Sequence, residues 1–452
     1  HQLKSPSPFY PFLSHIASGH LPLLSPFEST FCQRSTRTMQ RALPLALLLA
    51  VLAAAPAGAV RSQRRLRDAA ATSAACGAAA YAEFRRSLGA GEALAAENTS
   101  ASESRQALFA SRCRAVLAQN ADANARWRAT VNRFADRTHA ELRAHFGHKR
   151  TGFGDQSYGA PSMSSAPLPM AQSPTVLKDL PEVVDWRREL KSAWHIRDQG
   201  TCGSCWAMAA SGAVEMHAEL AGGSAEMVSA AQLVQCVPNP QRCGGSGGCD
   251  GATAELAFQF MKQHGVVVER GLGAGLQSGL CELRGRRRVM VRGFVQLPAN
   301  QGRPLLEALA SRGPVAVGVD ASDWFPYHSG IFDACHRDAV VNHAVLAVGY
   351  TKDAYIIRNS WGRSWGESGH IRLLRLGGSG DGYCGVDRNP EEGSACLGGP
   401  SELPVCGMCG VLSESAFPVG AHFVDEAPVS SGTRQGSLEP PASSGEKQGL
   451  AA

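Results

Sequence analysis

Three side chains of the types that can hydrolyse an acyl bond occur at wide spacing in this 452-residue chain. Cys205 stands in the segment 199–206 (Gln-Gly-Thr-Cys-Gly-Ser-Cys-Trp), His343 follows 138 residues later, and Asn359 another 16 residues on. A thiolate attacks carbonyl carbons, a histidine can take the thiol proton, and an asparagine can orient the imidazole. The set predicts covalent catalysis with Cys205 as nucleophile, His343 as proton carrier and Asn359 as its orienter.

The residues that follow Cys205 predict how the thiol is positioned. Residues 207–220 are rich in alanine, methionine, glutamate and leucine, which are good helix formers. Ser204 suits the N-cap of a helix that begins at Cys205. The first turn of a helix carries the positive end of its dipole, which stabilises a thiolate. We therefore expect Cys205 to begin a long helix that favours its ionised form.

Three short motifs around these residues resemble those of the papain-like cysteine proteases, including cathepsin L. Their order and spacing agree with the cysteine and histidine signature of that family. The resemblance implies an α+β, papain-like fold with a helical lobe and a β-barrel-like lobe, preceded by a helical propeptide. Cys205 would lie on the helical side of a cleft and the other two residues on the strand side. The motifs are Cys-Gly-Ser-Cys-Trp at 202–206, Asn-His-Ala-Val at 342–345 and Asn-Ser-Trp-Gly at 359–362.

The same resemblance implies roles for two further residues. The side-chain amide of Gln199 and the backbone N–H of Cys205 would form the oxyanion hole. Trp361 would shield the hydrogen bond between Asn359 and His343 from water and line the leaving-group side. The implied activity is that of an endopeptidase, made as a zymogen, that cleaves peptide bonds through a thioester acyl-enzyme.

The length of the chain exceeds that of one ordinary hydrophobic core, so we expect several parts. Met39, Arg41 and an apolar run over 42–55 form a signal-peptide pattern. The residues before Met39 are interpreted as translated upstream sequence, with a longer targeting leader as the alternative. The predicted parts are this segment at 1–38, a signal peptide at 39–59, a propeptide at 60–150, a linker at 151–179, a protease domain at 180–418 and a disordered tail at 419–452.

The propeptide prediction rests on a helical face and a short motif. The segment 60–145 is typical of helix, and Asn-Arg-Phe-Ala-Asp follows at 132–136. Both features are similar to the inhibitory propeptide of the same family, although Ala101 and Arg112 depart from its pattern, as does Val116. An unrelated amphipathic helix is the alternative. The residues that fall largely on one helical face are Arg105, Phe109, Val116 and Asn120.

The positive charge of the chain is concentrated in the same region. Residues 61–150 carry fifteen Arg and one Lys against eight acidic residues, whereas the whole chain has a net charge of +5. The basic balance therefore belongs to the propeptide, and it does not indicate binding of nucleic acid.

The protease region changes from helical to strand-like composition along its length. Residues 185–300 look helical and rich in glycine, and a basic run at 284–288 is interpreted as a surface loop. Short β-type runs occupy 314–319, 344–350, 354–358 and 370–376. This order favours the α+β class, with two lobes.

Fourteen cysteines in a chain with a signal-peptide pattern indicate an oxidising compartment. Eleven lie in the predicted mature region, and removing one nucleophile leaves an even number that suits five disulfides. The resemblance implies the pairs Cys202–Cys249 and Cys236–Cys281.

Cys335 has two candidate partners, Cys384 and Cys409. The residues 412–418 after Cys409 resemble the closing run of the family, which favours Cys409. Residues 384–408 would then be an insertion stapled by extra cysteines. The pairing of the remaining four stays open: Cys243, Cys384, Cys396 and Cys406.

Two Cys-x-x-Cys pairs, at 202–205 and 406–409, offer a function of another class. Thiol–disulfide exchange or a zinc site could use them. Against this, no strand–motif–helix unit surrounds the first pair, and His343 and Asn359 would have no role. A binding protein that keeps the fold without the activity is a third hypothesis, which the intact catalytic set and Gln199 oppose. We expect no cofactor and no metal.

The resemblance also implies a pocket for the side chain two residues before the scissile bond. Its small residues predict room for a bulky apolar side chain, and Glu414 at its floor could pair with Arg; a solvent-exposed Glu414 is the alternative. No histidine-rich insertion precedes Cys281, which favours endopeptidase over dipeptidase activity. The backbone-binding and pocket residues would be Gly251, Ala252, Thr253, Ala254, Gly318, Val341, Ala344 and Glu414.

The predicted surroundings follow from these assignments. We expect protein or peptide substrates, the propeptide as the chain's own inhibitor, no nucleic acid, no membrane span and a monomer. The signal peptide predicts the secretory pathway, ending in a lysosome or vacuole or outside the cell.

Overall fold

The computed structural model describes residues 74–88, 99–147, 179–269, 279–281, 287–376 and 382–425. All of them lie in one compact unit, Leu66–Ala452. The predicted leader and signal peptide, most of the predicted linker and the tail from residue 426 lie outside the described residues. Within the described part, no helix is both long and apolar enough to cross a membrane.

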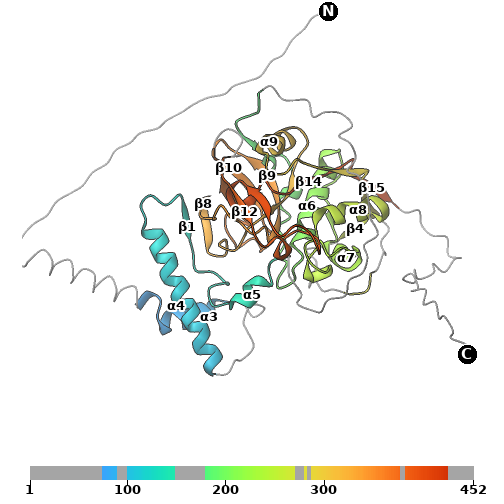
Figure 1. The fold of residues 1–452 in the computed structure, drawn as a ribbon. Coiled ribbons are helices and arrows are strands. Elements are labelled where there is room, and N and C mark those ends of the chain that lie inside the picture. Colours follow the sequence, from blue (N-terminus) through green and yellow to red (C-terminus); the bar gives the residue numbers. More distant parts are fainter. Residues whose placement is uncertain are drawn as a thin grey trace, which may run out of the picture. The chain divides into compact units, whose positions relative to one another are not determined.

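The amino-terminal region is mainly helical and is joined by a disulfide. The rings of Tyr81, Phe84 and Phe109 pack together, and Cys76 is bonded to Cys113 beside them. Sequence reasoning did not foresee this disulfide, because the cysteine count covered only the mature region. The elements are α3 (Ala78–Ser87), α4 (Thr99–Ala121), β1 (Trp127–Ala129) and α5 (His139–Arg143) (Figure 1).

The helical lobe is built around α6 (Cys205–Leu220), which is buried along almost its whole length. Small residues allow this burial, because neighbouring elements approach the helix backbone closely: a Cβ at Gly212 would lie 1.5 Å from Nη2 of Arg358. The other elements of the lobe are α7 (Ala230–Cys236), η3 (Gly248–Asp250), α8 (Ala254–His264) and a small sheet of β3 (Met227–Val228), β4 (Val266–Glu269), β5 (Arg287–Met290) and β15 (His422–Asp425) (Figure 1).

The strand lobe is a mixed sheet of nine strands with the order β1-β8-β11-β10-β9-β7-β14-β6, and β2 pairs with β9. Among the described residues these strands pair in an open series rather than a closed ring, and the mixture of helices and sheets agrees with the predicted α+β class. The central strands β7, β9 and β10 are buried along their whole length. The strands are β2 (Val184–Asp185), β6 (Gly293–Gln296), β7 (Val315–Val319), β8 (Tyr327–Phe332), β9 (His343–Tyr350), β10 (Ala354–Arg358), β11 (His370–Leu374) and β14 (Ser415–Val419).

The described elements form two large apolar cores, one for each lobe. The strand-lobe core also contains Val116, Trp127 and Phe134 of the amino-terminal region. β1 itself adds to the sheet edge by pairing with β8. Remaining short elements connect these parts: η1 (Trp186–Arg188), η2 (Ser192–Trp194), α9 (Gly302–Ser311), η4 (Pro390–Glu392) and η5 (Met408–Gly410).

Two predicted boundaries at the carboxyl-terminal side were wrong. The basic run at 284–288 is not all loop, because Arg287 and Arg288 begin β5. The domain also continues past Pro418, because β15 pairs with β5 over His422–Asp425. Composition alone did not reveal this strand, because its support comes from residues distant in sequence: the paired strand β5 and the helical-lobe core, against which Phe423 packs.

The predicted insertion is an ordered hairpin. β12 (Cys384–Asp387) and β13 (Leu403–Cys406) pair in antiparallel fashion. We call β12, β13 and the loop between them the insertion hairpin.

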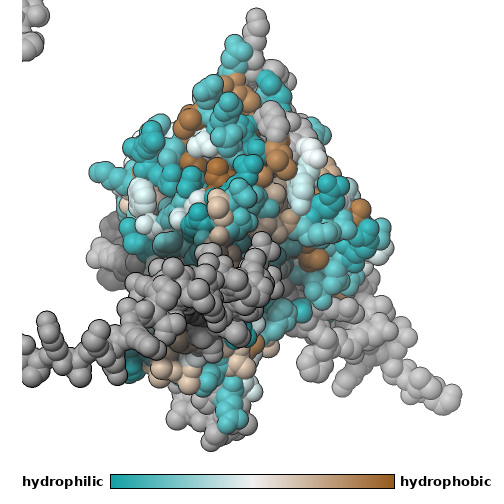
Figure 2. Space-filling model, turned by 90° about the vertical axis from the view of Figure 1, so that its left-hand side faces the viewer, coloured by the Kyte–Doolittle hydropathy of each residue, from teal (hydrophilic) through white to brown (hydrophobic). Residues whose placement is uncertain are grey.

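The face in Figure 2 is largely hydrophilic, with apolar residues in small separate groups, as on ordinary protein surfaces.

Candidate active site

Cys205 is the first residue of α6 and is completely buried. Among the described cysteines it is the one outside a disulfide. Its Sγ accepts a hydrogen bond from the Ala344 N–H at 3.3 Å. Ser204 occupies the N-cap position as predicted, but its side chain makes no capping hydrogen bond; its Oγ faces the Cys202 carbonyl at 3.4 Å.

The ionisation of Cys205 differs from the sequence expectation. Burial raises the pKa of the thiol to about 11, although the N–H groups of Ala344 and Gly147 lower it. The desolvation of a fully covered sulfur outweighs the helix dipole here. In this form of the chain Cys205 is therefore held as a thiol.

The predicted histidine and asparagine lie together on the strand side. His343 begins β9 and is fully buried; its Nε2 lies 2.8 Å from Oδ1 of Asn359, which follows β10. The Trp361 ring lies over the imidazole, with 5.1 Å between ring centroids. Because Ala344 follows His343 directly and bonds to Cys205, the fold brings the three predicted residues to one place from both lobes.

Gln199 joins the two sides of this site. Its Oε1 accepts from Ser360 Oγ at 2.6 Å, and its backbone N–H donates to the Ser360 carbonyl at 2.9 Å. Its Nε2 donates to the carbonyls of Cys202 and His145, each at 2.9 Å. The amide expected to receive a substrate oxyanion is thus bonded to the propeptide.

The propeptide chain crosses the site at Phe146 and Gly147. A Cβ placed on Gly147 would lie 2.2 Å from Cys205 Sγ, so only glycine fits over the sulfur. The Gly147 carbonyl lies against Gly251, where a Cβ would be 1.6 Å away. Sequence reasoning missed this contact; the glycine at the end of the predicted propeptide was its one visible signal.

Three consecutive residues of the amino-terminal region attach this segment to the two lobes. Asn132 Nδ2 donates to the Phe325 carbonyl at 2.7 Å. Arg133 forms an ion pair with Asp198, with Nη2 2.9 Å from Oδ1, and also donates to the Trp361 carbonyl at 3.1 Å. Phe134 packs on the rings of both Phe325 and Trp361, at centroid distances of 5.0 and 5.6 Å.

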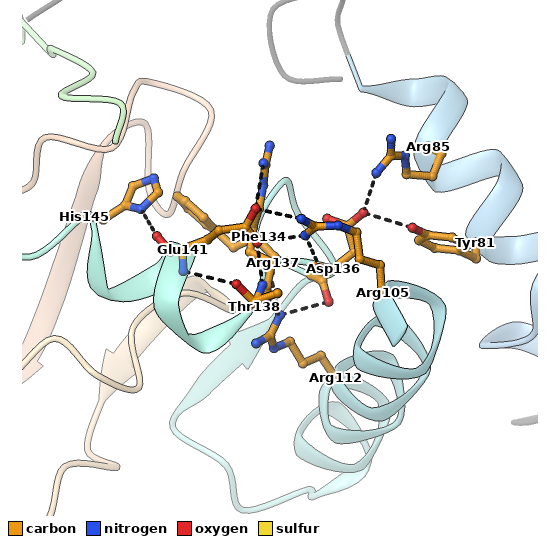
Figure 3. A network of polar contacts seen from close by, with 11 residues as sticks. Tyr81, Arg85, Arg105, Arg112, Phe134, Asp136, Arg137, Thr138, Glu141 and His145 are labelled. Carbon is orange, nitrogen blue, oxygen red and sulfur yellow. Dashed lines mark hydrogen bonds and ion pairs between the residues drawn. The ribbon is translucent and has the colours of Figure 1, made fainter. Parts of the chain in front are cut away.

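A polar network inside the propeptide supports these contacts (Figure 3). Arg105 binds both carboxylate oxygens of Glu141 at 2.8 Å, and this pairing holds the pKa of Glu141 at about 2. Arg112 donates to the Arg137 carbonyl at 2.6 Å. Arg112 departs from the family pattern, yet its guanidinium satisfies the backbone of the loop between β1 and α5.

Asp136 and Asn120 hold the rest of that loop. The buried Asp136 carboxylate accepts from Arg85 at 3.0 Å and from Tyr81 at 3.2 Å. Asn120 bonds both the N–H and the carbonyl of Ala129, at 2.8 and 2.9 Å. Two of the motif positions singled out in the sequence therefore act by fixing β1 and the turn after it.

An open pocket of about 280 Å³ lies beside the site, between the lobes. Five of the predicted pocket residues line it: Thr253, Ala254, Gly318, Ala344 and Glu414, together with Glu255, Ala316 and Val317. Val341 lies behind Gly318, where a Cβ would be 2.7 Å from Val341 Cγ1. Gly251 and Ala252 are outside this lining, and Gly251 instead faces the propeptide.

Glu414 lies in the pocket wall rather than in open solvent. Burial, together with the neighbouring carboxylates of Glu255 and Asp387, raises its pKa to about 7, although a hydrogen bond from Ser394 lowers it. Ser394 belongs to the insertion hairpin, and its Oγ donates to Oε1 of Glu414.

The disulfides include the three pairs implied by the resemblance: Cys202–Cys249, Cys236–Cys281 and Cys335–Cys409. The four cysteines left open pair as Cys243–Cys396 and Cys384–Cys406. Neither Cys-x-x-Cys pair forms an internal disulfide: Cys202, Cys406 and Cys409 each bond to a cysteine outside the motif, and Cys205 is free. This arrangement does not fit the thiol-exchange or zinc hypothesis.

Comparisons with known proteins identify one protein family. The model of the family described as papain family cysteine protease matches residues 180–393. Oryzain beta chain of Oryza sativa subsp. japonica is 34% identical over 295 residues, covering 63% of this chain and 60% of that one. Cysteine endopeptidase RepA of the same organism is 31% identical over 323 residues, covering 69% and 76%. The chain thus spans about 60% of the length of the first of these relatives.

Solved structures with a similar fold belong to proteins of the same kind. Digestive procathepsin L 3 of Tenebrio molitor larval midgut has a TM-score of 0.54 and 26% identity, covering 73% of this chain and 95% of that chain. Digestive procathepsin L2 proteinase of the same source has a TM-score of 0.58 at 24% identity, with coverages of 76% and 99%, and supports the fold.

Proposed function

Because the chain belongs to the papain family of cysteine proteases, we propose that it is a cysteine endopeptidase made as an inactive precursor. The observation that carries the proposal is the meeting of Cys205 from the helical lobe with His343 and Asn359 from the strand lobe, beside the Gln199 amide. Residues 74–147 are the proposed inhibitory propeptide in the described part of the chain.

The proposed reaction proceeds in two stages. His343 takes the thiol proton as Cys205 Sγ attacks the scissile carbonyl, and the resulting oxyanion accepts from the Cys205 N–H and the Gln199 amide. The amine then leaves with the proton from His343, and water attacks the thioester to release the acid and restore the thiol. Each oxyanion donor lowers the barrier by about 3 kcal/mol. Asn359 holds the imidazole in the tautomer that this transfer requires.

Inhibition is proposed to work by occupation of the same groups. Gly147 covers the sulfur, and the His145 carbonyl uses the Gln199 amide. Cleavage of the chain after the propeptide would release both groups. The thiol would then be exposed to solvent and to His343, which favours its ionised form.

The proposed substrates are peptides with a bulky apolar residue or Arg two positions before the scissile bond. The pocket lined by Gly318, Ala344 and Glu414 supports this, because it is open and has two carboxyl groups, those of Glu255 and Glu414. The six disulfides of the described residues suit the secretory pathway, with a lysosome, a vacuole or the exterior as the destination.

Covalent labelling tests the proposal. Acid-activated protein is treated with an epoxysuccinyl thiol-protease inhibitor and analysed by intact mass, with the Cys205→Ser variant as control. We expect one adduct, mapped to Cys205, with loss of peptide cleavage, and no adduct on the variant. Correctly processed protein that takes no adduct and cleaves no peptide would exclude the protease function and favour a binding role for the same fold.

A further inference from the structure

The insertion hairpin joins the two lobes covalently. One disulfide, Cys384–Cys406, closes the base of the hairpin. A second, Cys243–Cys396, joins the hairpin loop to Cys243. Cys243 lies between α7 and η3 in the helical lobe, whereas the hairpin is attached to the strand lobe. The bond therefore spans the cleft from one wall to the other.

Hydrogen bonds fix the base of the hairpin to the strand lobe. The Val386 N–H donates to Asp338 Oδ1 at 2.9 Å. The Val341 N–H donates to Oδ2 of the buried Asp387 at 3.2 Å. Because Val341 backs the pocket at Gly318, the hairpin begins at the pocket wall.

Two backbone hydrogen bonds attach the hairpin loop to the helical lobe. The Gly244 N–H donates to the Ala395 carbonyl at 3.2 Å, and the Leu397 N–H donates to the Gln241 carbonyl at 3.1 Å. They flank the Cys243–Cys396 bond on both sides. A short ladder with a disulfide at its centre thus connects the two walls.

Neighbouring contacts place this connection at the end of the pocket away from Cys205. Gly147 over the sulfur touches Gly251, and Gly251 in turn touches Gly244, whose carbonyl would be 2.0 Å from a Cβ at Gly251. Gly244 bonds to the hairpin loop, and the next loop residue inward, Ser394, bonds to Glu414 of the pocket. A chain of contacts from the sulfur through Gly251 and Gly244 therefore reaches the hairpin, and Ser394 joins the hairpin to the pocket.

We propose that the insertion hairpin narrows the cleft behind the pocket, so that the proposed endopeptidase cleaves peptides with two residues before the scissile bond faster than longer ones, which remain substrates. This inference rests on the proposed protease function and concerns the length of substrate that the site accepts. A polypeptide chain that extended further in the same direction would meet the Cys243–Cys396 ladder.

The closed end has the chemistry to receive a free amino terminus. Glu255 and Glu414 both line the pocket. An α-ammonium group on the second residue of a substrate would lie near these two carboxyl groups, whereas an acetylated terminus carries no charge. The preference should therefore combine a length limit with an attraction for the charged terminus.

Peptide length provides the test. Acid-activated protein is given Phe-Arg-aminomethylcoumarin with a free amino terminus, its acetylated form, and Ala-Ala-Phe-Arg-aminomethylcoumarin, and kcat/KM is measured for each. Active sites are counted by stoichiometric iodoacetamide labelling of Cys205. We expect kcat/KM for the two-residue substrate to exceed that for the four-residue one at least tenfold, with the acetylated dipeptide between them.

Two double variants complete the experiment. Removing the cross-lobe bond with C243A and C396A should bring the two lengths within about threefold of each other. Removing the base disulfide with C384A and C406A is the matched control, and it should keep the preference. Equal cleavage of both lengths by titrated wild-type protein, or an unchanged preference in the first variant, would overturn the inference while leaving the protease function intact. Absence of Cys205 labelling would overturn both.

Discussion

At the scale of single residues, Gly147 is the closest propeptide contact of the nucleophile. It is a glycine with no strained backbone, so its role is steric: any Cβ would collide with Cys205 Sγ. The clash can be relieved only by moving the propeptide chain away from the sulfur, because α6 is packed on all sides.

Gly147→Ala should therefore weaken inhibition. Overpacking of this kind costs about 1–3 kcal/mol, which corresponds to a rise of about 5- to 140-fold in the fraction of open precursor. The rate of Cys205 alkylation by iodoacetamide in the intact precursor measures it. Gly382→Ala is the matched control, because nothing lies within 4 Å of its Cβ position. Equal rates in both variants would contradict the steric role.

The pKa of Glu414 predicts how the preference between Arg and Leu substrates changes with pH. Its pKa of about 7 means that it is neutral in acid and charged above neutrality. The ratio of kcat/KM for Arg to that for Leu, two positions before the scissile bond, should rise as pH increases from 5 to 8. Taking the ratio cancels the ionisation of Cys205 and His343, which both substrates share. In Glu414→Gln the ratio should be low and flat, and a ratio that still rises would assign the titration to another group.

At the scale of elements, the Cys76–Cys113 disulfide determines how firmly α3 is held on α4. It closes a loop with a sequence separation of 37 residues, for which the chain-entropy argument gives a stabilisation of about 4 kcal/mol at most. Arg85 and Tyr81 of α3 also reach Asp136, so loss of α3 would loosen the loop that carries Arg133 and Phe134.

Replacing Cys76 and Cys113 with Ser should therefore lower the stability of the propeptide and speed activation. Urea unfolding of the precursor, in a Cys205→Ser background that prevents self-cleavage, gives the loss of stability directly. We expect a loss of about 2–4 kcal/mol confined to the propeptide transition. An unchanged transition would mean that packing of the Tyr81, Phe84 and Phe109 rings suffices to hold α3.

A second prediction at this scale concerns the anchoring of α6. Glu215 is fully buried on this helix; it pairs with Arg197, accepts the Val228 N–H at 2.8 Å and lies near Arg358. Glu215→Gln leaves buried guanidinium charge uncompensated, which costs about 3–5 kcal/mol in such pairs. Glu226→Gln, at a partly exposed pair, should cost under about 1 kcal/mol. Similar unfolding free energies for the two variants would contradict this.

The sequence predicted the elements better than their connections. α6 begins at Cys205 as expected, and the runs expected at 344–350 and 354–358 are strands because apolar β-type residues are continuous there. The hairpin pairing and the cross-lobe disulfide could not be predicted, because they depend on which distant backbone faces each cysteine. The contact of Gly147 with Cys205 could not be predicted for the same reason.

At the scale of the whole molecule, inhibition and acidity are linked through the propeptide. Pairing with Arg105 holds the pKa of Glu141 at about 2, below its ordinary 4.5. A carboxyl group with a lowered pKa stabilises the folded state above its unfolded pKa, and this contribution is lost as pH falls from about 4.5 through 2. The precursor should therefore become easier to open in acid.

Glu141→Gln tests this link. The urea midpoint of the propeptide transition in the Cys205→Ser precursor should fall between pH 6 and pH 3, and the fall should be smaller in the variant. The variant should also be less stable at pH 6, because the bidentate pair is lost. An identical fall in both proteins would assign the acid sensitivity to other carboxylates.

The inhibitory segment and the site it covers belong to one chain, and this has a consequence for dilution. A tethered segment faces its own site at an effective concentration in the millimolar range, whatever the concentration of the protein. A single cut between them turns the same contacts into an encounter of two molecules, which weakens as the solution is diluted. Precursor molecules would stay closed when scarce, whereas cut molecules would open most completely when scarce, so that concentration itself would separate the stored form from the working one.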